Sequence, residues 1–119
     1  MSLRESIFAA EQEKQVLHEA FVPTWGVTVF FKPLTLAERG KIRTGAMVMN
    51  SQSGEFELNP EMFDLVTVLL KTLDADGNPI FKLSDREFLE SGASNEAIQY
   101  LSRVIHGGGK EVKETPKNS

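Results

Sequence analysis

Apolar and polar residues alternate most clearly between positions 27 and 32, which read Val-Thr-Val-Phe-Phe-Lys. A period of two predicts a β-strand with one buried face. The preceding segment, residues 15–22, holds β-compatible residues without clean alternation and predicts a second, less regular strand. Pro23 and Gly26 lie between the segments, and they favour a turn because proline fixes φ and glycine readily adopts positive φ. The pattern therefore predicts an antiparallel β-hairpin.

Helix-start signals recur along the rest of the chain. A serine or threonine followed three residues later by glutamate can form a capping box, in which both side chains satisfy free amides at the helix end. Such pairs are Ser2 with Glu5, Thr35 with Glu38 and Ser84 with Glu87. Asn59 before Pro60 is typical of an N-cap and a first helical residue, and Ser94 or Asn95 caps the last helix.

These signals and the spacing of apolar residues predict a series of short helices. The one that begins at Pro60 has the most apolar stripe, so we expect it to be the central core helix. The predicted helices are residues 3–12; one after Thr35 with Leu36, Ile42, Ala46 and Met49; one from Pro60 with Val66, Leu69, Leu70 and Leu73; one from Ser84 to Gly92; and one with Ile98, Leu101, Val104 and Ile105 that stops at Gly107.

Two polar segments separate the predicted helices. Residues 50–54 read Asn-Ser-Gln-Ser-Gly and predict a flexible loop. Residues 74–79 read Asp-Ala-Asp-Gly-Asn-Pro and predict a turn, because Asp, Gly, Asn and Pro each favour turn geometry. We expect Ile80 and Phe81 to fold back against the core after it.

Together these elements predict one α+β domain over residues 1–106. An isolated hairpin is marginal in water, so helices must cover one of its faces. We expect the N-terminal hairpin to pack against a small bundle of about four short helices. Residues 107–119 contain a single apolar residue, Val112, and predict a flexible, disordered tail.

Composition narrows the function classes. The 119-residue chain is 40% hydrophobic and 25% charged, which is ordinary for one soluble domain. Its net charge of −4, without a basic cluster, argues against nucleic-acid binding. It has no cysteine, which excludes disulfides and thiolate metal sites. No apolar run suits a signal peptide or a membrane span, so we expect a cytoplasmic protein.

The Asp74 turn is the candidate cation site. Asp74, Asp76 and Asn78 alternate around a glycine, as oxygen ligands do in a calcium loop. When Gly77 takes the glycine position of that loop, however, the first and last ligand positions fall on Thr72 and Leu83. A plain turn is therefore the favoured interpretation, and a metal-dependent regulatory or enzymatic domain stays the weaker one.

Candidate catalytic groups are sparse. His18 and His106 are the only imidazoles and lie near opposite ends of the chain without a recognisable partner. Residues 107–110 read Gly-Gly-Gly-Lys but lack the leading glycine and the following Ser or Thr of a phosphate-binding loop. We therefore expect a noncatalytic protein without a cofactor.

Aromatic and methionine side chains offer a better candidate, a surface for protein contacts. The candidates for this role are Trp25, Phe30, Met47, Met49 and Phe56. The alternative for each is an ordinary core position. Phe30 and Phe31 are neighbours in a strand and cannot share a face, so one of them needs a second layer or a partner.

The order of several segments resembles a known family over about Ser6 to Ile105. The segments are Val-Pro-Thr-Trp-Gly-Val-Thr-Val, Pro-Leu-Thr-Leu-Ala-Glu-Arg, Asp-Ala-Asp-Gly-Asn-Pro-Ile-Phe and Leu-Ser-Asp-Arg-Glu-Phe-Leu. In this order the chain resembles the tail assembly chaperones of lambda-like, long-tailed bacteriophages. The resemblance implies a small α+β protein of the host bacterial cytoplasm that binds the tape measure protein, keeps its apolar helices soluble and helps to recruit tail tube subunits. A homo-oligomer is also compatible with the resemblance.

In such phages a −1 ribosomal frameshift near the end of the reading frame often yields a longer second product. Codons for Gly109 and Lys110 can spell a run of G followed by a run of A, which is the type of sequence on which this shift occurs. The pair is therefore a candidate frameshift position. A gene without a G-rich to A-rich heptamer near these codons would remove the hypothesis.

A second functional class remains beside the chaperone. A structural virion component, such as a minor tail or head-tail connector subunit, would also be small and noncatalytic. Presence in mature particles separates the two, because a chaperone leaves before the particle is complete.

Overall fold

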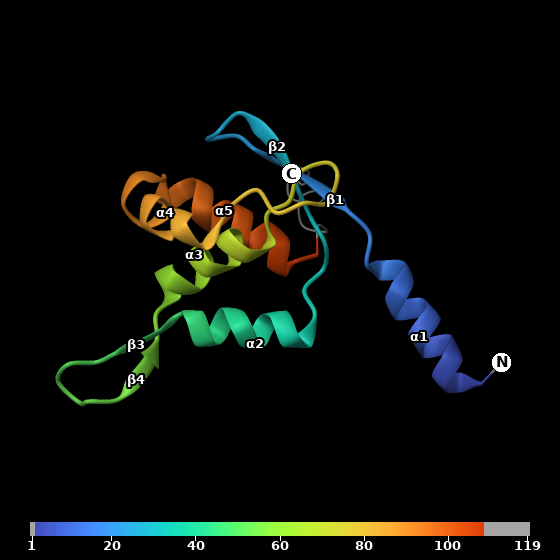
Figure 1. Cartoon of the computed structure of the whole chain (residues 1–119), viewed down its shortest axis with the longest axis horizontal. Helices are drawn as coiled ribbons and strands as arrows, with labels where there is room; N and C mark the ends of the chain where they lie inside the picture. Colours follow the sequence, from blue (N-terminus) through green and yellow to red (C-terminus); the bar gives the residue numbers. More distant parts are fainter. Residues whose placement is uncertain (1, 109–119) are drawn as a thin grey trace, which may run out of the picture.

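The computed structural model describes residues 2–108; Met1 and residues 109–119, which include Gly109, Lys110 and most of the predicted tail, lie outside the described part. Within residues 2–108 the chain has the predicted α+β fold, with five α-helices and two antiparallel hairpins (Figure 1). The elements are α1 (Leu3–Lys14), β1 (His18–Val22), β2 (Val27–Phe31), α2 (Leu36–Gly45), β3 (Met47–Met49), β4 (Phe56–Leu58), α3 (Pro60–Lys71), a 3-10 turn (Leu83–Asp85), α4 (Arg86–Gly92) and α5 (Asn95–His106).

The first hairpin forms as predicted from β1 and β2. His18 pairs with Phe31 and Ala20 with Val29, and paired residues of antiparallel strands point to the same face. That face is buried through Ala20, Val22, Val29 and Phe31, and α5 contacts β1. Gly26 adopts φ 69°, the conformation for which the turn needs glycine.

The helix that begins after Asn59, α3, is the central core helix, as predicted. The Asn59 side chain accepts a hydrogen bond from the Met62 amide at 2.9 Å and so caps α3, with Pro60 as its first residue. α3 contacts α2, α4 and α5. Its buried residues are Leu65, Val66, Thr67, Val68, Leu69 and Lys71, and those of α5 are Ala97, Ile98, Leu101, Ser102, Val104 and Ile105.

Polar side chains join α3 to α5 within this apolar contact. The Ser102 hydroxyl donates to Asp64 Oδ1 at 2.7 Å. The Thr67 hydroxyl donates its single proton to the Phe63 carbonyl at 2.8 Å. His106 Nε2, 2.9 Å from Thr67 Oγ1, must therefore be the donor in that contact. These pairings satisfy the buried hydroxyls of Thr67 and Ser102.

An ion pair joins α2 to α3. Lys71 is 7% exposed, and its Nζ lies 2.8 Å from Glu38 Oε1. The same Glu38 oxygen accepts the Thr35 amide at 3.0 Å, which completes the predicted capping box. Burial acts to raise the pKa of Glu38, but the hydrogen bonds from Lys71 and Thr35 and the charge of Lys71 outweigh it. The pKa of Glu38 therefore lies below its ordinary value.

The apolar stripe predicted for the second helix is partly wrong. α2 ends at Gly45, so Met49 lies in β3 instead. Ile42 and Ala46 are buried, whereas Leu36 is 87% exposed. Leu36 precedes Ile42 by six residues, which places it about 120° around the helix axis from the buried side.

The capping box predicted for the fourth helix is also wrong. The Asp85 carboxylate, rather than Glu87, reaches back and accepts the Lys82 amide at 2.8 Å. This bond opens a 3-10 turn, and α4 begins only at Arg86. The predicted end at Gly92 is confirmed, as are the Ser94 cap and the Gly107 end of α5.

The Asp74 segment forms the predicted turn, which the Asp74 side chain stabilises by accepting two backbone amides. Asp74 Oδ1 accepts the Asp76 amide at 2.9 Å and the Asn78 amide at 3.0 Å. After the turn Phe81 packs partly against the core as expected, but Ile80 is 43% exposed, against the prediction.

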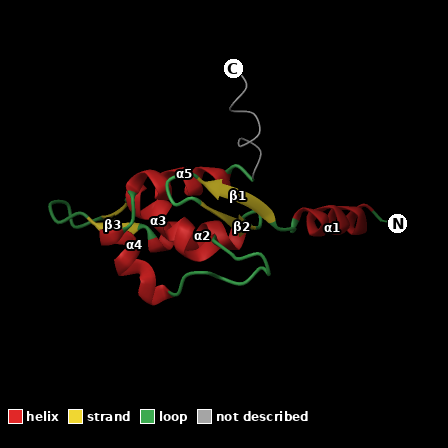
Figure 2. Cartoon of the chain, turned by 90° about the horizontal axis from the view of Figure 1, so that it is seen from above, coloured by secondary structure: helices red, strands yellow, loops and turns green. Residues whose placement is uncertain are grey.

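Two elements project from this body at opposite ends (Figures 1 and 2). α1 forms over slightly more than its predicted length, with the Ser2 and Glu5 capping box present, yet it buries no residue. At the other end, residues 50–54 are the turn of a second hairpin, β3 and β4, where only a flexible loop was predicted.

Candidate binding surface

The second hairpin presents an apolar face to solvent. Met47 pairs with Leu58 and Met49 with Phe56, so these four side chains share one face. Met47 is 37%, Met49 58%, Phe56 63% and Leu58 45% exposed. A two-stranded hairpin is marginal on its own in water, and an apolar face on a projecting one is typical of a binding surface. We call these four side chains the hairpin face.

Polar groups at the tip and base shape this hairpin. Asn50 Oδ1 accepts the amides of Gln52 at 2.8 Å and Ser53 at 3.2 Å, and its amide nitrogen donates to Glu57 at 3.1 Å. At the base, the Asn59 amide donates to the Ala46 carbonyl at 2.9 Å. These bonds hold the strands in register without using the hairpin face.

The predicted contact residues divide into two groups. Met47, Met49 and Phe56 lie together on the hairpin face, whereas Trp25 and Phe30 lie elsewhere. Trp25 occupies the turn of the first hairpin and is half-buried against the core. Phe30 is half-buried on the outer face of β2, and its backbone exchanges hydrogen bonds with Leu73 at 2.9 and 2.7 Å. The five predicted contact residues therefore do not form one continuous surface.

Trp25 lines a separate hollow, which we call the aromatic cleft. Phe81 and Phe88 form its other aromatic walls, and Leu89 and Ala93 of the α4 segment lie beside them. Phe88 is 62% exposed and Phe81 half-buried. The residues that line this cleft carry no charge.

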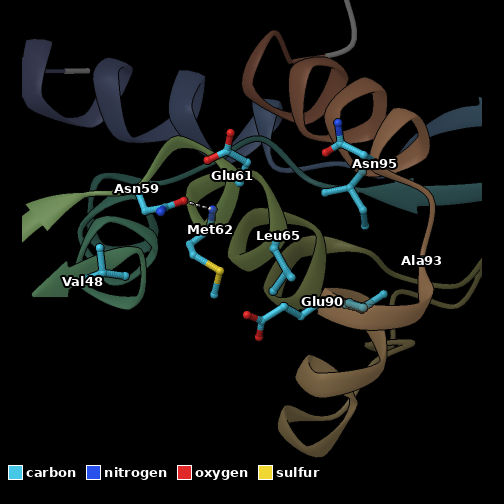
Figure 3. A pocket seen from close by; sticks show the side chains of 10 residues that line it. Val48, Asn59, Glu61, Met62, Leu65, Glu90, Ala93 and Asn95 are labelled. Atoms are coloured by element: carbon cyan, nitrogen blue, oxygen red, sulfur yellow. Dashed lines mark hydrogen bonds between the residues drawn. The ribbon is translucent and has the colours of Figure 1, made fainter. Parts of the chain in front are cut away.

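A groove of about 470 Å³ lies among α3, α4 and the start of α5 (Figure 3). Its apolar wall includes Met62, Leu65 and Leu89. Figure 3 shows Glu61 of α3 and Glu90 of α4 on opposite sides of Leu65, with Val48 of β3 at one end. We call this hollow the acidic groove.

Several exposed apolar residues were not predicted as contacts. Leu58 completes the hairpin face, Val48 lines the acidic groove, and Phe88 lines the aromatic cleft. Phe21 is 53% exposed on the outer face of the first hairpin. The Phe-Glu-Leu of β4 alternates, which is a usable signal, but three residues are too few for it to stand out.

The two histidines, distant in sequence, line one cavity with Arg39 and Pro33. His18 stacks on Phe31, with ring centroids 5.6 Å apart, and His106 stacks on Phe63 at 4.9 Å. Burial lowers the pKa of His106, and the charge of Arg39 lowers it further against an opposing effect of Asp64. Both rings thus pack on aromatic neighbours.

No histidine and carboxylate cluster able to hold a metal ion occurs among residues 2–108. None of the helices in this part of the chain has the length and apolar character needed to cross a bilayer. The sequence matches no family model, and no matching protein is found among curated proteins or among solved structures.

Proposed function

We propose that this protein is a noncatalytic tail assembly chaperone of a phage or prophage, acting in the host bacterial cytoplasm. It binds the tape measure protein and assists assembly of the tail tube. The order of sequence segments described above supports the family. The observation that carries the binding role is the exposed hairpin face of Met47, Met49, Phe56 and Leu58.

The chemistry of the hairpin face suits an apolar helical client. Methionine is unbranched and polarizable, so Met47 and Met49 adapt to side chains of different shape. Phe56 contributes a large apolar area at one edge. Such a surface covers apolar helices without demanding one sequence, which is what keeping a long tape measure protein soluble requires.

The structural-subunit alternative is supported by α1. This helix has Leu3, Ile7 and Phe8 more than half exposed and buries no residue. A 12-residue helix is marginal by itself in water, so a neighbour in an assembled particle would stabilise it. Detection of the protein in mature particles, by mass spectrometry of purified virions, would favour this alternative.

Co-expression with the tape measure protein encoded downstream tests the chaperone proposal. We expect the tape measure protein to stay soluble and to co-purify with this chain. The double variant Met49→Ser/Phe56→Ser should lose both effects, because it removes the most exposed part of the hairpin face.

The matched control is Phe21→Ser/Leu36→Ser. It removes two exposed apolar side chains, 53% and 87% exposed, from elsewhere on the molecule. This variant should solubilise the tape measure protein as the wild type does. An insoluble tape measure protein beside folded wild-type chain would reject the chaperone role.

A further inference from the structure

The acidic groove and the aromatic cleft adjoin. Leu89 and Ala93 line both hollows, so the two meet along the α4 segment. The combined track begins at Val48 beneath the second hairpin and ends at Trp25 in the turn of the first. Val48 lies on the opposite side of β3 from the hairpin face, because neighbouring residues of a strand point to opposite faces. The track is therefore a second, chemically different site, separate from the hairpin face.

The track differs from a plain apolar groove because two carboxylates line it. Glu61 and Glu90 are the charged residues among those that line it, and neither takes part in a salt bridge within residues 2–108. Between them lie apolar side chains such as Met62 and Leu65. Two carboxylates beside an apolar floor complement a segment that carries both apolar residues and a cation.

We propose that the track from Val48 to Trp25 binds an apolar segment bearing lysine or arginine. Its cation lies between Glu61 and Glu90, and an apolar side chain enters the aromatic cleft. This inference rests on the proposed function, since it makes that segment part of the tape measure protein. The chain's net charge of −4 favours approach of such a basic segment over an acidic one.

Trp25 reports directly on occupancy, because it is the only tryptophan of the chain and lines the aromatic cleft. The probe is a helical peptide of leucine, alanine and two central lysines, without aromatic residues and about 18 residues long. Matched peptides carry glutamine or glutamate in place of the lysines. We expect the lysine peptide to shift Trp25 emission to shorter wavelength and to protect it from acrylamide.

The groove variant is Glu61→Gln/Glu90→Gln. Removing two solvent-exposed charge pairs should weaken binding of the lysine peptide about three- to tenfold, with little effect on the glutamine peptide. The difference should shrink in about 1 M salt, where exposed charges are screened. The control Glu87→Gln/Glu96→Gln changes the same net charge on α4 and on the first turn of α5, outside the track, and should bind as the wild type does.

Three results would overturn the inference. They are Trp25 emission unchanged at saturating peptide, equal affinity for the lysine and glutamate peptides, or emission that shifts with protein concentration alone, which would assign the track to a second copy. Failure here with a soluble, co-purifying tape measure protein leaves the proposed function intact. Preference for the lysine peptide beside an insoluble tape measure protein rejects the proposed function and keeps the site.

Discussion

The two hairpins of this protein have the same local design and opposite surroundings. In each, a glycine with positive φ donates its amide to a carbonyl four residues earlier, Gly26 to Val22 and Gly54 to Asn50, both at 2.8 Å. The first hairpin buries one face in the core, whereas every residue of β3 and β4 is exposed. Apolar side chains thus stabilise the fold in the first hairpin and remain available to a partner in the second.

Truncating one phenylalanine in each hairpin is the strongest test of this contrast. Phe31→Ala removes a fully buried ring and should lower the free energy of unfolding by about 3–5 kcal/mol. Phe56→Ala removes a ring that is 63% exposed and should change it by less than about 0.5 kcal/mol. Urea unfolding of both variants measures the difference.

Because small domains are stable by only about 5–15 kcal/mol, Phe31→Ala can leave the chain mostly unfolded. Phe31→Leu keeps most of the apolar volume and should retain a measurable transition. A loss of several kcal/mol from Phe56→Ala would contradict the contrast, since it would place the hairpin face in the folded core.

The same contrast explains which parts of the fold could be predicted. Residues 27–31 alternate because one face is buried, and burial selects apolar residues at every second position. In β3 neither face is buried, so Met-Val-Met shows no alternation and does not predict a strand. Helix caps were predicted well at Ser2, Thr35 and Asn59, because capping depends on a few neighbouring residues.

The site was harder to predict than the fold, because exposure depends on the tertiary arrangement. Residue type indicates Met49 and Phe56 as contact residues, and they do lie on one face, yet their pairing depends on the second hairpin, which the sequence pattern does not predict. Residue type also indicates Trp25, which lies apart from the hairpin face, in the aromatic cleft. Glu61 and Glu90 line one groove because α3 packs against α4, which no local pattern indicates.

Replacing each turn glycine by alanine tests the contrast with a pair of matched substitutions, whose expected effect on stability is smaller. A Cβ at either position meets no atom within 4 Å, so only the positive φ opposes alanine. Gly26→Ala should cost about 1–2 kcal/mol of global stability, because the first hairpin opens only with the core. Gly54→Ala should cost less, because the second hairpin can relieve the strain by opening locally.

Urea unfolding gives the global cost of each alanine, and amide hydrogen exchange at Phe56 follows local opening. Faster exchange at Phe56 in the Gly54→Ala variant, with nearly unchanged global stability, is the expected pattern. Equal global losses for the two variants would instead mean that both hairpins unfold with the core.

Lowering the pH to mildly acidic values should change the free energy of unfolding least of all. The change should arise beside the first hairpin and not in the second. The chain's two histidines line a cavity beside the first hairpin, together with Glu13, Lys14 and Arg39, and neither strand of the second hairpin contains one. Burial holds the pKa of His106 below its ordinary 6.5, so near that pH the unfolded chain binds more protons than the folded one. The stability that the neutral ring contributes above pH 6.5 should therefore be lost as pH falls from there through the folded pKa.

One group can contribute at most about 1.4 kcal/mol per pH unit, so we expect a loss below about 1 kcal/mol between pH 6.5 and 5.5. Urea unfolding at these two pH values measures the loss. His106→Gln should reduce it, because the glutamine amide can still donate to Thr67 but does not titrate. Met49→Ser should keep it, because the hairpin face lies apart from His106. An equal loss in wild type and His106→Gln would assign the pH dependence to another group.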